Sequence, residues 1–165
     1  MEEKMFRLAR PEEYGRLAAY IARLWHSAYD GLLGEAQVEY MTQKFQSAAA
    51  IAEQTEKENY IYFFIADGNR EIGYCAVRPL EDSLFLSKLY LEEECRGRGV
   101  GQRALAQVCA IAKRLALPRV WLTVNKGNAR AIRAYEKFGF VRTDSTVTDI
   151  GGGYAMDDYI YEYAV

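Results

Sequence analysis

One segment constrains the fold of this chain more than any other, because a strand, a glycine-rich turn and a helix follow one another in it. Residues 84–91 (LFLSKLYL) have the composition of a strand, and residues 100–116 repeat apolar side chains at helical spacing. Between them runs the sequence RGRGVG, residues 96–101. Glycines let a backbone approach a ligand closely, and the first N–H groups of a helix attract an anion. The segment therefore predicts a phosphate-binding turn between a strand and a helix.

The glycine spacing does not fit the two common nucleotide motifs. A dinucleotide fingerprint that begins at Gly97 and Gly99 needs glycine at position 102, which is Gln102, and an acidic residue about twenty positions further on, which is also missing. No Gly-Lys-Ser/Thr sequence is present, so the P-loop pattern fails as well. The arginines at 96, 98 and 103 nevertheless support an anionic ligand at this turn.

The hydrophobic pattern of the whole chain predicts one mixed α/β domain over residues 1–165. We expect a hairpin turn at Asp67-Gly68-Asn69 and a helix stop at Gly139. The expected strands cover 5–9, 60–66, 71–78, 84–91, 120–124, 141–150 and 154–163, and the expected helices cover 11–29, 35–52, 100–116 and 129–138. This order places the strands in a single sheet.

Charge and composition exclude several classes of protein. The net charge is −2, which argues against a general nucleic-acid binder. No apolar run approaches the ~20 residues of a membrane span, and no signal-peptide core follows the N-terminus. Three scattered cysteines without C-x-x-C spacing and a single histidine, His26, predict a reducing compartment and no metal site. We therefore expect a cytoplasmic protein.

The charges are nevertheless unevenly distributed along the chain. Residues 95–142 hold eleven basic side chains and one acidic side chain, Glu136. Residues 143–165 hold five acidic side chains and no Lys or Arg, and residues 1–94 hold ten basic and 17 acidic side chains. A basic middle between acidic segments favours an anionic ligand in one part and a cationic ligand in another.

Two motifs in the middle of the chain resemble the GNAT family of N-acetyltransferases. Residues 96–101 match the R/Q-x-x-G-x-G/A signature that cradles the pyrophosphate of acetyl-CoA. A second block matches the family's N-x-x-A-x-x-x-Y-x-x-x-G-F spacing, from Asn128 through Tyr135 to Phe140. The resemblance is strong over residues 60–142 and looser in the N-terminal helices and the C-terminal strands. It implies a mostly antiparallel sheet of about seven strands flanked by about four helices.

The resemblance also implies an acyltransferase that uses acetyl-CoA and releases coenzyme A. The backbone of the fourth strand would pair with the pantetheine arm, the glycine-rich turn would hold the pyrophosphate, and Asn128 would contact the arm while capping its helix. The cofactor-binding residues implied in this way are Leu89, Tyr90, Leu91, Arg96, Gly97, Arg98, Gly99, Val100, Gly101, Gln102, Asn128 and Tyr135.

Tyr135 matches the general acid of the family, which returns a proton to the CoA thiolate. A phenol with a pKa near 10 can serve in that role, although a tyrosine just before Phe138 and Phe140 is also common in packing. The general base is left open, because the position that carries a glutamate in some family members is Thr123. The candidates are His26, Tyr29, Asp30, Glu92 and a chain of ordered water.

The acceptor is expected to be a small cationic amine. Asp157 and Asp158 lie among tyrosines near the C-terminus, and Tyr29 and Asp30 lie where family members build the acceptor cleft. Carboxylates and aromatic faces suit an ammonium group. Both segments resemble the spermidine/spermine acetyltransferase (PaiA-like) group. Charges that keep an edge strand from aggregating would explain Asp157 and Asp158 equally well.

Three other functions remain open at this point. The chain could acetylate a protein N-terminus or a lysine, it could bind acyl-CoA without turnover, or it could be a dimeric structural protein. An acidic tail favours short cations over peptides, and a pure binding module needs no acid such as Tyr135. A homodimer is common in the family, and the sequence leaves the oligomeric state open.

Overall fold

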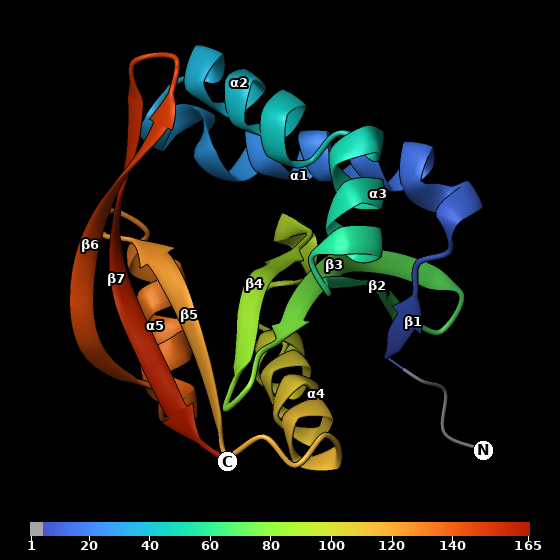
Figure 1. The fold of residues 1–165 in the computed structure, drawn as a ribbon, viewed down its shortest axis with the longest axis vertical. Coiled ribbons are helices and arrows are strands. Elements are labelled where there is room, and N and C mark those ends of the chain that lie inside the picture. The colour runs from blue at the N-terminus through green and yellow to red at the C-terminus, as the bar shows by residue number, and fades with distance from the viewer. Residues whose placement is uncertain (1–4) are drawn as a thin grey trace. The chain divides into compact units, whose positions relative to one another are not determined.

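Seven strands form one sheet in the order β1-β2-β3-β4-β5-β7-β6, in a computed structural model that describes residues 5–165 (Figure 1). β4 and β5 are parallel, whereas β1 with β2, β5 with β7 and β6 with β7 are antiparallel. The elements are β1 Phe6–Leu8, η1 Pro11–Glu13, α1 Tyr14–Leu33, α2 Glu35–Phe45, α3 Ala48–Lys57, β2 Ile61–Asp67, β3 Arg70–Pro79, β4 Leu84–Leu91, η2 Glu93–Cys95, α4 Val100–Arg114, β5 Arg119–Asn125, α5 Ala129–Phe138, β6 Val141–Gly151 and β7 Tyr154–Ala164. The mixed α/β sheet confirms the expected fold class.

The chain divides into two compact units. The first contains the residues up to Ala76 together with Leu89–Glu93, and the second contains Val77–Lys88 and Glu94–Val165. The prediction of a single domain over 1–165 stays a prediction. No helix within residues 5–165 is long and apolar enough to cross a membrane.

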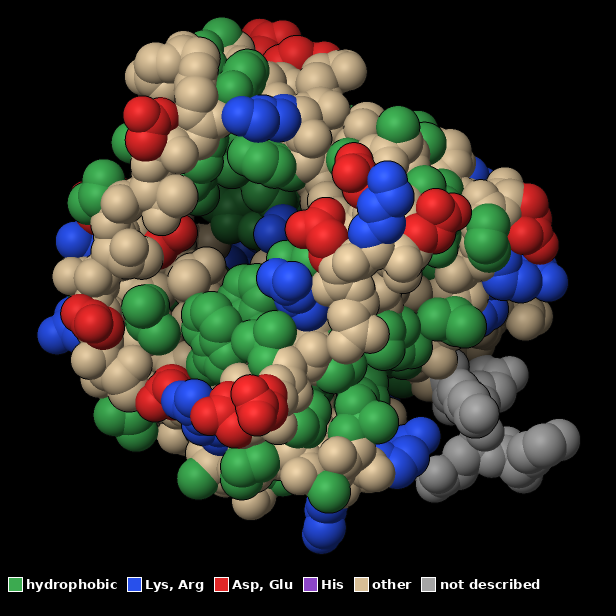
Figure 2. Space-filling view, in the orientation of Figure 1, with side chains coloured by type: hydrophobic (Ala, Val, Ile, Leu, Met, Phe, Trp, Pro, Cys, Tyr) green, Lys and Arg blue, Asp and Glu red, His purple; other side chains and the backbone are tan. Residues whose placement is uncertain are grey.

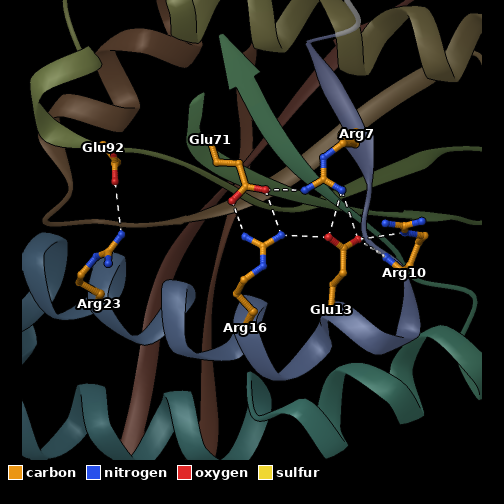
Figure 3. A network of polar contacts seen from close by, with 7 residues as sticks. All are labelled: Arg7, Arg10, Glu13, Arg16, Arg23, Glu71 and Glu92. Carbon is orange, nitrogen blue, oxygen red and sulfur yellow. Dashed lines mark hydrogen bonds and ion pairs between the residues drawn. The ribbon is translucent and has the colours of Figure 1, made fainter. Parts of the chain in front are cut away.

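In the first unit, α1 packs against α2 and α3, and β1 pairs with β2. The apolar side chains that recur at helical spacing in α1, such as Leu17 and Ile21, are fully buried. A network of charged side chains joins β1, η1, α1 and β3, as Figure 3 shows. In it, Glu13 and Glu71 each pair with both Arg7 and Arg16.

The helical region after α1 differs from the prediction. The segment 35–52 was expected to be one helix, but it breaks at Gln46 into α2 and α3. Gln46 is buried and its amide exchanges hydrogen bonds with Tyr62 and Tyr74, while Ser47 caps α3 by accepting from the N–H of Ala50. Residues 5–165 therefore contain five α-helices, rather than about four.

The first helix also ends later than the sequence suggested. We expected it to stop near Tyr29, with Gly31 and Gly34 as breakers, but α1 continues through Gly31 to Leu33. Gly34 ends it with a φ of +86°, a conformation that glycine adopts without strain. The first turn, Pro11–Glu13, is a 3₁₀ helix rather than the start of the α-helix.

In the second unit, α4 packs on β5 and contacts α5, and β6 and β7 form a long hairpin (Figure 1). β5 alternates strictly between buried and half-buried residues, with Val120, Leu122 and Val124 facing the core. The observed bounds of β4 and α5 agree with the predicted ones, and those of β5, β6 and β7 agree within one residue at each end.

Candidate active site

The glycine-rich turn in the second unit opens directly onto the start of α4. Gly97 and Gly99 have φ angles of +81° and +74°, and a Cβ atom built at either glycine would meet open space. Gly99 is the N-cap residue, so the helix has no cap side chain there, and its first intrahelical bond runs from the N–H of Arg103 to Gly99 at 3.1 Å. The N–H groups of residues 100–102 are therefore left for a ligand.

This geometry fits a phosphate group. The dipole of α4, which is 15 residues long, places partial positive charge at that end. Arg96, Arg98 and Arg103 stand in or beside the turn. Because both glycines face open space, a pyrophosphate can approach the backbone closely here. The observed turn is thus suited to the pyrophosphate of a CoA ester.

α5 carries Tyr135 and is hydrogen-bonded to the residues that follow this turn. The amide of Gln102 donates a hydrogen bond to the carbonyl oxygen of Ala134 at 3.0 Å, which joins the first turn of α4 to α5. Asn128 caps α5 by accepting from the N–H of Ala131 at 3.2 Å. The Tyr135 ring meets the buried Phe140 edge to face, at 5.8 Å between centroids. The second block of the sequence therefore folds into one capped helix beside the turn.

Within the second unit, β4 pairs with β5 at the beginning of β4. The two strands pair through Leu84 with Val120 and through Phe85 with Trp121, whose rings stack at 4.3 Å. Within the second unit, the register of β4 with β5 does not extend to residues 86–88. Figure 2 shows hydrophobic side chains gathered at the surface over the paired ends of β4 and β5. A strand that separates from its neighbour offers backbone groups to an extended ligand.

The remainder of β4, residues 89–91, belongs to the first unit and is packed there through Tyr90. The Tyr90 ring stacks on Tyr74 at 5.6 Å and contacts Trp25 at 5.4 Å. Its hydroxyl lies 2.9 Å from that of Tyr29. Two of the residues predicted for the site, Tyr29 and Tyr90, are therefore in direct contact.

The candidate bases in the first unit are all engaged with other side chains. His26 lies between Asp30, at 2.7 Å, and Glu39, at 2.9 Å, and hydrogen bonds to these carboxylates raise the pKa of the imidazole. Glu92 accepts from Arg23 and Arg70. The structure thus gives each of these candidates a structural partner, and it does not single one out as a base.

Asp157 and Asp158 have opposite environments, although the sequence treats them alike. Asp157 faces solvent and forms an ion pair of 2.9 Å with Lys126. Asp158 is only 7% exposed, and its Oδ1 atom has no hydrogen-bond partner among the described residues. Burial raises the pKa of Asp158, while the charge of Lys88 opposes that shift. The Oδ1 atom of Asp158 can therefore accept a hydrogen bond from a ligand.

Lys88 is a lysine of β4 that the sequence analysis did not single out. It follows Leu84 and Leu86 on the same face of β4, and its Nζ donates to the carbonyl and to the hydroxyl of Ser87, both at 3.1 Å. Desolvation lowers the pKa of Lys88 to about 8, although the charge of Asp158 acts in the opposite direction. The available signal was that Lys88 is the one charged residue of this strand.

The fold and the anion-binding turn are those of an acyl-CoA-dependent acyltransferase. The model of the acetyltransferase (GNAT) family matches residues 19–140. The chain therefore belongs to the GNAT acetyltransferase family, and its acyl donor is acetyl-CoA, as the two sequence motifs implied. Similar chains include an uncharacterized N-acetyltransferase of Mycobacterium bovis, 33% identical over 146 residues that cover 87% of this chain and 92% of the relative.

Other similarities are partial or concern the fold alone. A spermine/spermidine N(1)-acetyltransferase of Bacillus subtilis is 31% identical over 58 residues, 34% of this chain and 38% of that protein. The PaiA N-acetyltransferase of Thermoplasma acidophilum, solved with coenzyme A, superimposes with a TM-score of 0.80 at 20% identity over 97% of this chain and 98% of that chain. An Elizabethkingia anophelis acetyltransferase with acetyl-CoA bound superimposes with a TM-score of 0.58 at 15% identity, over 70% of this chain and 82% of that chain.

Proposed function

We propose that this enzyme transfers the acetyl group of acetyl-CoA to a primary amine of a small polycationic acceptor, a polyamine, by direct attack of the amine. The observation that carries the acceptor class is the buried carboxylate of Asp158, which has one oxygen without a partner among residues 5–165. Leaving such an oxygen unpaired is costly, and an ammonium group would satisfy it with a charge-assisted hydrogen bond.

The charge around Asp158 also suits a cation, because Asp157 adds negative charge next to it. The side chains of Asp157 and Tyr159 lie on the other face of β7, since successive residues of a strand point to opposite faces. There Asp157 pairs with Lys126, and the Tyr159 ring contacts Lys126, at 5.4 Å, and Arg142, at 4.5 Å. The acceptor assignment therefore depends on the carboxylate of Asp158 and not on the Tyr159 ring.

Two similarities support the same acceptor class. The Bacillus subtilis relative is named for spermine and spermidine, and its match covers about a third of this chain. The PaiA structure shares the fold over nearly the whole length. We infer the acceptor from these similarities only in combination with the environment of Asp158.

The remaining roles follow the geometry of the two motifs. We assign the pyrophosphate to the N–H groups at the start of α4, together with Arg96 and Arg98, and the arm to the backbone of Leu89–Leu91 and to Asn128. An N–H group of β4 would polarise the thioester carbonyl, an effect typically worth about 3–4 kcal/mol per donor. Tyr135 would return a proton to the departing thiolate.

The test is release of free thiol from acetyl-CoA at pH 8 with spermidine, spermine, putrescine, amino acids, an aminoglycoside and short peptides. We expect polyamines to be preferred. Asp158→Asn should raise the KM for spermidine roughly tenfold or more, because a hydrogen bond to a charged group is worth about 1.5–3 kcal/mol. The affinity for CoA should not change.

Asp144→Asn is the matched control, because Asp144 is an exposed aspartate of β6 whose Oδ1 accepts from the N–H of Ser145. This variant should behave as the wild type. Turnover of peptides alone would overturn the polyamine assignment. An unchanged KM in Asp158→Asn would remove Asp158 from the acceptor site.

A further inference from the structure

We propose that Glu136 and Tyr161 are positioning residues that together hold the ring of Tyr135 in place. The hydroxyl of Tyr161 in β7 donates a hydrogen bond of 2.8 Å to Oε2 of Glu136, the residue that follows Tyr135 in α5. All three residues belong to the second unit. The effect on turnover rests on the proposed role of Tyr135 as general acid, whereas the position of its ring can be measured independently of that role.

α5 depends on a few contacts for its place in the second unit. None of its ten residues is fully buried, whereas α4 buries Leu105 and Val108 in the core. Its last turn is held by the ring of Phe138, whose centroid lies 5.0 Å from that of Tyr163 in β7. A helix without a buried apolar stripe relies more than others on directional contacts such as hydrogen bonds.

Two hydrogen bonds hold α5 at the residues on either side of Tyr135. The carbonyl oxygen of Ala134 accepts from the amide of Gln102 in α4, and the carboxylate of Glu136 accepts from Tyr161 in β7. Successive side chains of an α-helix point about 100° apart, so a rotation of α5 that moved Tyr135 would also break the bond to Glu136. The bond from β7 therefore fixes the rotational setting of the turn that carries Tyr135.

The donor of this bond is itself held firmly. Tyr161 is 1% exposed, and its strand pairs on both sides, with Leu122 of β5 and with Arg142 of β6 opposite to it. Burial, together with the hydrogen bond to Glu136, raises the pKa of Tyr161, so the hydroxyl keeps its proton and remains a donor. A hydrogen bond to an ionised carboxylate is stronger than one between neutral groups.

The charge around Glu136 supports a positioning role rather than a general electrostatic one. Glu136 is the single acidic side chain among residues 95–142, where eleven side chains are basic. It nevertheless forms no ion pair with a lysine or arginine of residues 5–165, and its carboxylate accepts from the neutral phenol of Tyr161 instead. A carboxylate that only balanced the basic charge of this segment would be expected to pair with one of these cations.

The first experiment measures turnover with the best amine found. Tyr161→Phe removes the hydroxyl and keeps the ring, and kcat should fall about tenfold or more, because a small displacement of a catalytic group can cost up to about 100-fold. The KM for acetyl-CoA should stay within about threefold. Glu136→Met should have the same effect as Tyr161→Phe. Glu136→Gln retains an oxygen that can accept from Tyr161, so its kcat should stay within about threefold of the wild type.

Tyr14→Phe is the matched control, because it also removes a tyrosine hydroxyl that forms a side-chain hydrogen bond. The hydroxyl of Tyr14 donates to Thr55 at 3.1 Å in the first unit. This variant should turn over as the wild type does. Wild-type kcat in both Tyr161→Phe and Glu136→Met would overturn the proposal.

A double-mutant cycle separates positioning of Tyr135 from a merely structural effect. In the Tyr135→Phe background no acid remains to be positioned, so adding Tyr161→Phe should lower kcat by less than about twofold. The same loss of kcat in both backgrounds would show that the bond between Tyr161 and Glu136 stabilises the fold without acting through Tyr135, and it would overturn the proposal.

NMR spectroscopy tests the position of the ring without any turnover. The rings of Tyr135 and Phe140 meet edge to face, with 5.8 Å between centroids, so their protons should show a nuclear Overhauser effect. This effect should weaken in Tyr161→Phe and persist in Tyr14→Phe. An unchanged effect in Tyr161→Phe would overturn the proposal.

The outcomes distinguish this proposal from the proposed function. An undiminished kcat in Tyr135→Phe would refute the acid role alone, and the ring measurement would still decide whether Tyr161 and Glu136 position Tyr135. Circular dichroism and thermal unfolding show whether Tyr161→Phe is folded. If it is not, the ring measurement is made on Glu136→Met and Glu136→Gln, because Glu136 is only half-buried and its substitution leaves the core intact. Equal ring contacts in these two variants would then overturn the proposal.

Discussion

Gly73 of β3 lies against the carbonyl oxygen of Tyr90 in β4, so close that a Cβ atom at position 73 would overlap this oxygen. The same atom would lie 3.0 Å from Cδ2 of Leu91 and 3.1 Å from its Cα. The first unit therefore needs a glycine at this position in order to bring β3 against the segment of β4 assigned to the pantetheine arm. Tyr90 is further held by its hydroxyl contact with Tyr29.

Gly73→Ala should push the backbone of β4 out of place. We expect the free energy of unfolding to fall by about 1–3 kcal/mol, the usual cost of overpacking, and the affinity for CoA to fall with it. Urea unfolding and calorimetry measure the two effects. Gly15→Ala is the control, because a Cβ there meets open space in α1 and alanine favours a helix. Equal effects of the two substitutions would contradict the close approach.

Tyr135→Phe should lower kcat by at least about 100-fold with little change in CoA affinity, because loss of a positioned acid typically costs 10²–10⁴-fold. The ring contact with Phe140 is apolar and survives the substitution. Single-turnover kinetics and CoA calorimetry separate the two quantities. An undiminished kcat would show that Tyr135 serves packing alone.

His26, the single histidine of the chain, should make stability dependent on pH. Hydrogen bonds to Glu39 and Asp30 raise the pKa of His26 above its unfolded value of about 6.5. This stabilisation is complete below pH 6.5 and is lost as the pH rises through the folded-state pKa. Urea unfolding at several pH values between 5.5 and 9 should show the loss, and His26→Gln should abolish it. A pKa of His26 below 6.5, measured by following its ring protons with ¹H NMR as the pH changes, would refute the expectation.

Glu13 should contribute stability that disappears in acid. Burial raises the pKa of this carboxyl, but hydrogen bonds from the backbone of Arg10 and from Arg7 and Arg16 outweigh burial and lower the pKa to about 2. The contribution is therefore present above pH 4.5 and lost as the pH falls toward 2. Glu13→Gln should cost about 1 kcal/mol at pH 7, since water screens the half-exposed guanidinium groups (Figure 3).

Glu12→Gln provides the comparison for that experiment. Glu12 is exposed and lies 3.5 Å from Arg10. Its substitution should change the free energy of unfolding by less than about 0.5 kcal/mol and leave the acid dependence as in the wild type. If Glu12→Gln flattened the acid dependence as Glu13→Gln does, the network around Glu13 would not be its source.

Much of the fold was predictable because its signals are local. The alternating residues of β4 and the capping Asn128 of α5 act within a few positions of themselves, and both elements have the predicted bounds. The break between α2 and α3 was not predictable in this way. Gln46 ends α2 because its amide is buried against Tyr62 and Tyr74, which come from β2 and β3.

The candidate site shows the same contrast between local signals and long-range packing. Glycine spacing and the position of Tyr135 were visible in the sequence, since the phosphate turn and its helix are contiguous. The sequence placed Asp157 and Asp158 side by side without distinguishing them. Only the packing of β7 makes one an exposed partner of Lys126 and the other a buried carboxylate with an open oxygen.

The sequence by itself thus determined the family, the acyl donor and the order of the elements, because each depends on short-range pattern. Tertiary structure alone decided which charged groups lose their water. Lys88 reads as an ordinary lysine until β4 and β7 place it in a desolvated position with Asp158 as its charged neighbour. Desolvation depends on what packs around a group from distant parts of the chain, and residue type does not specify it.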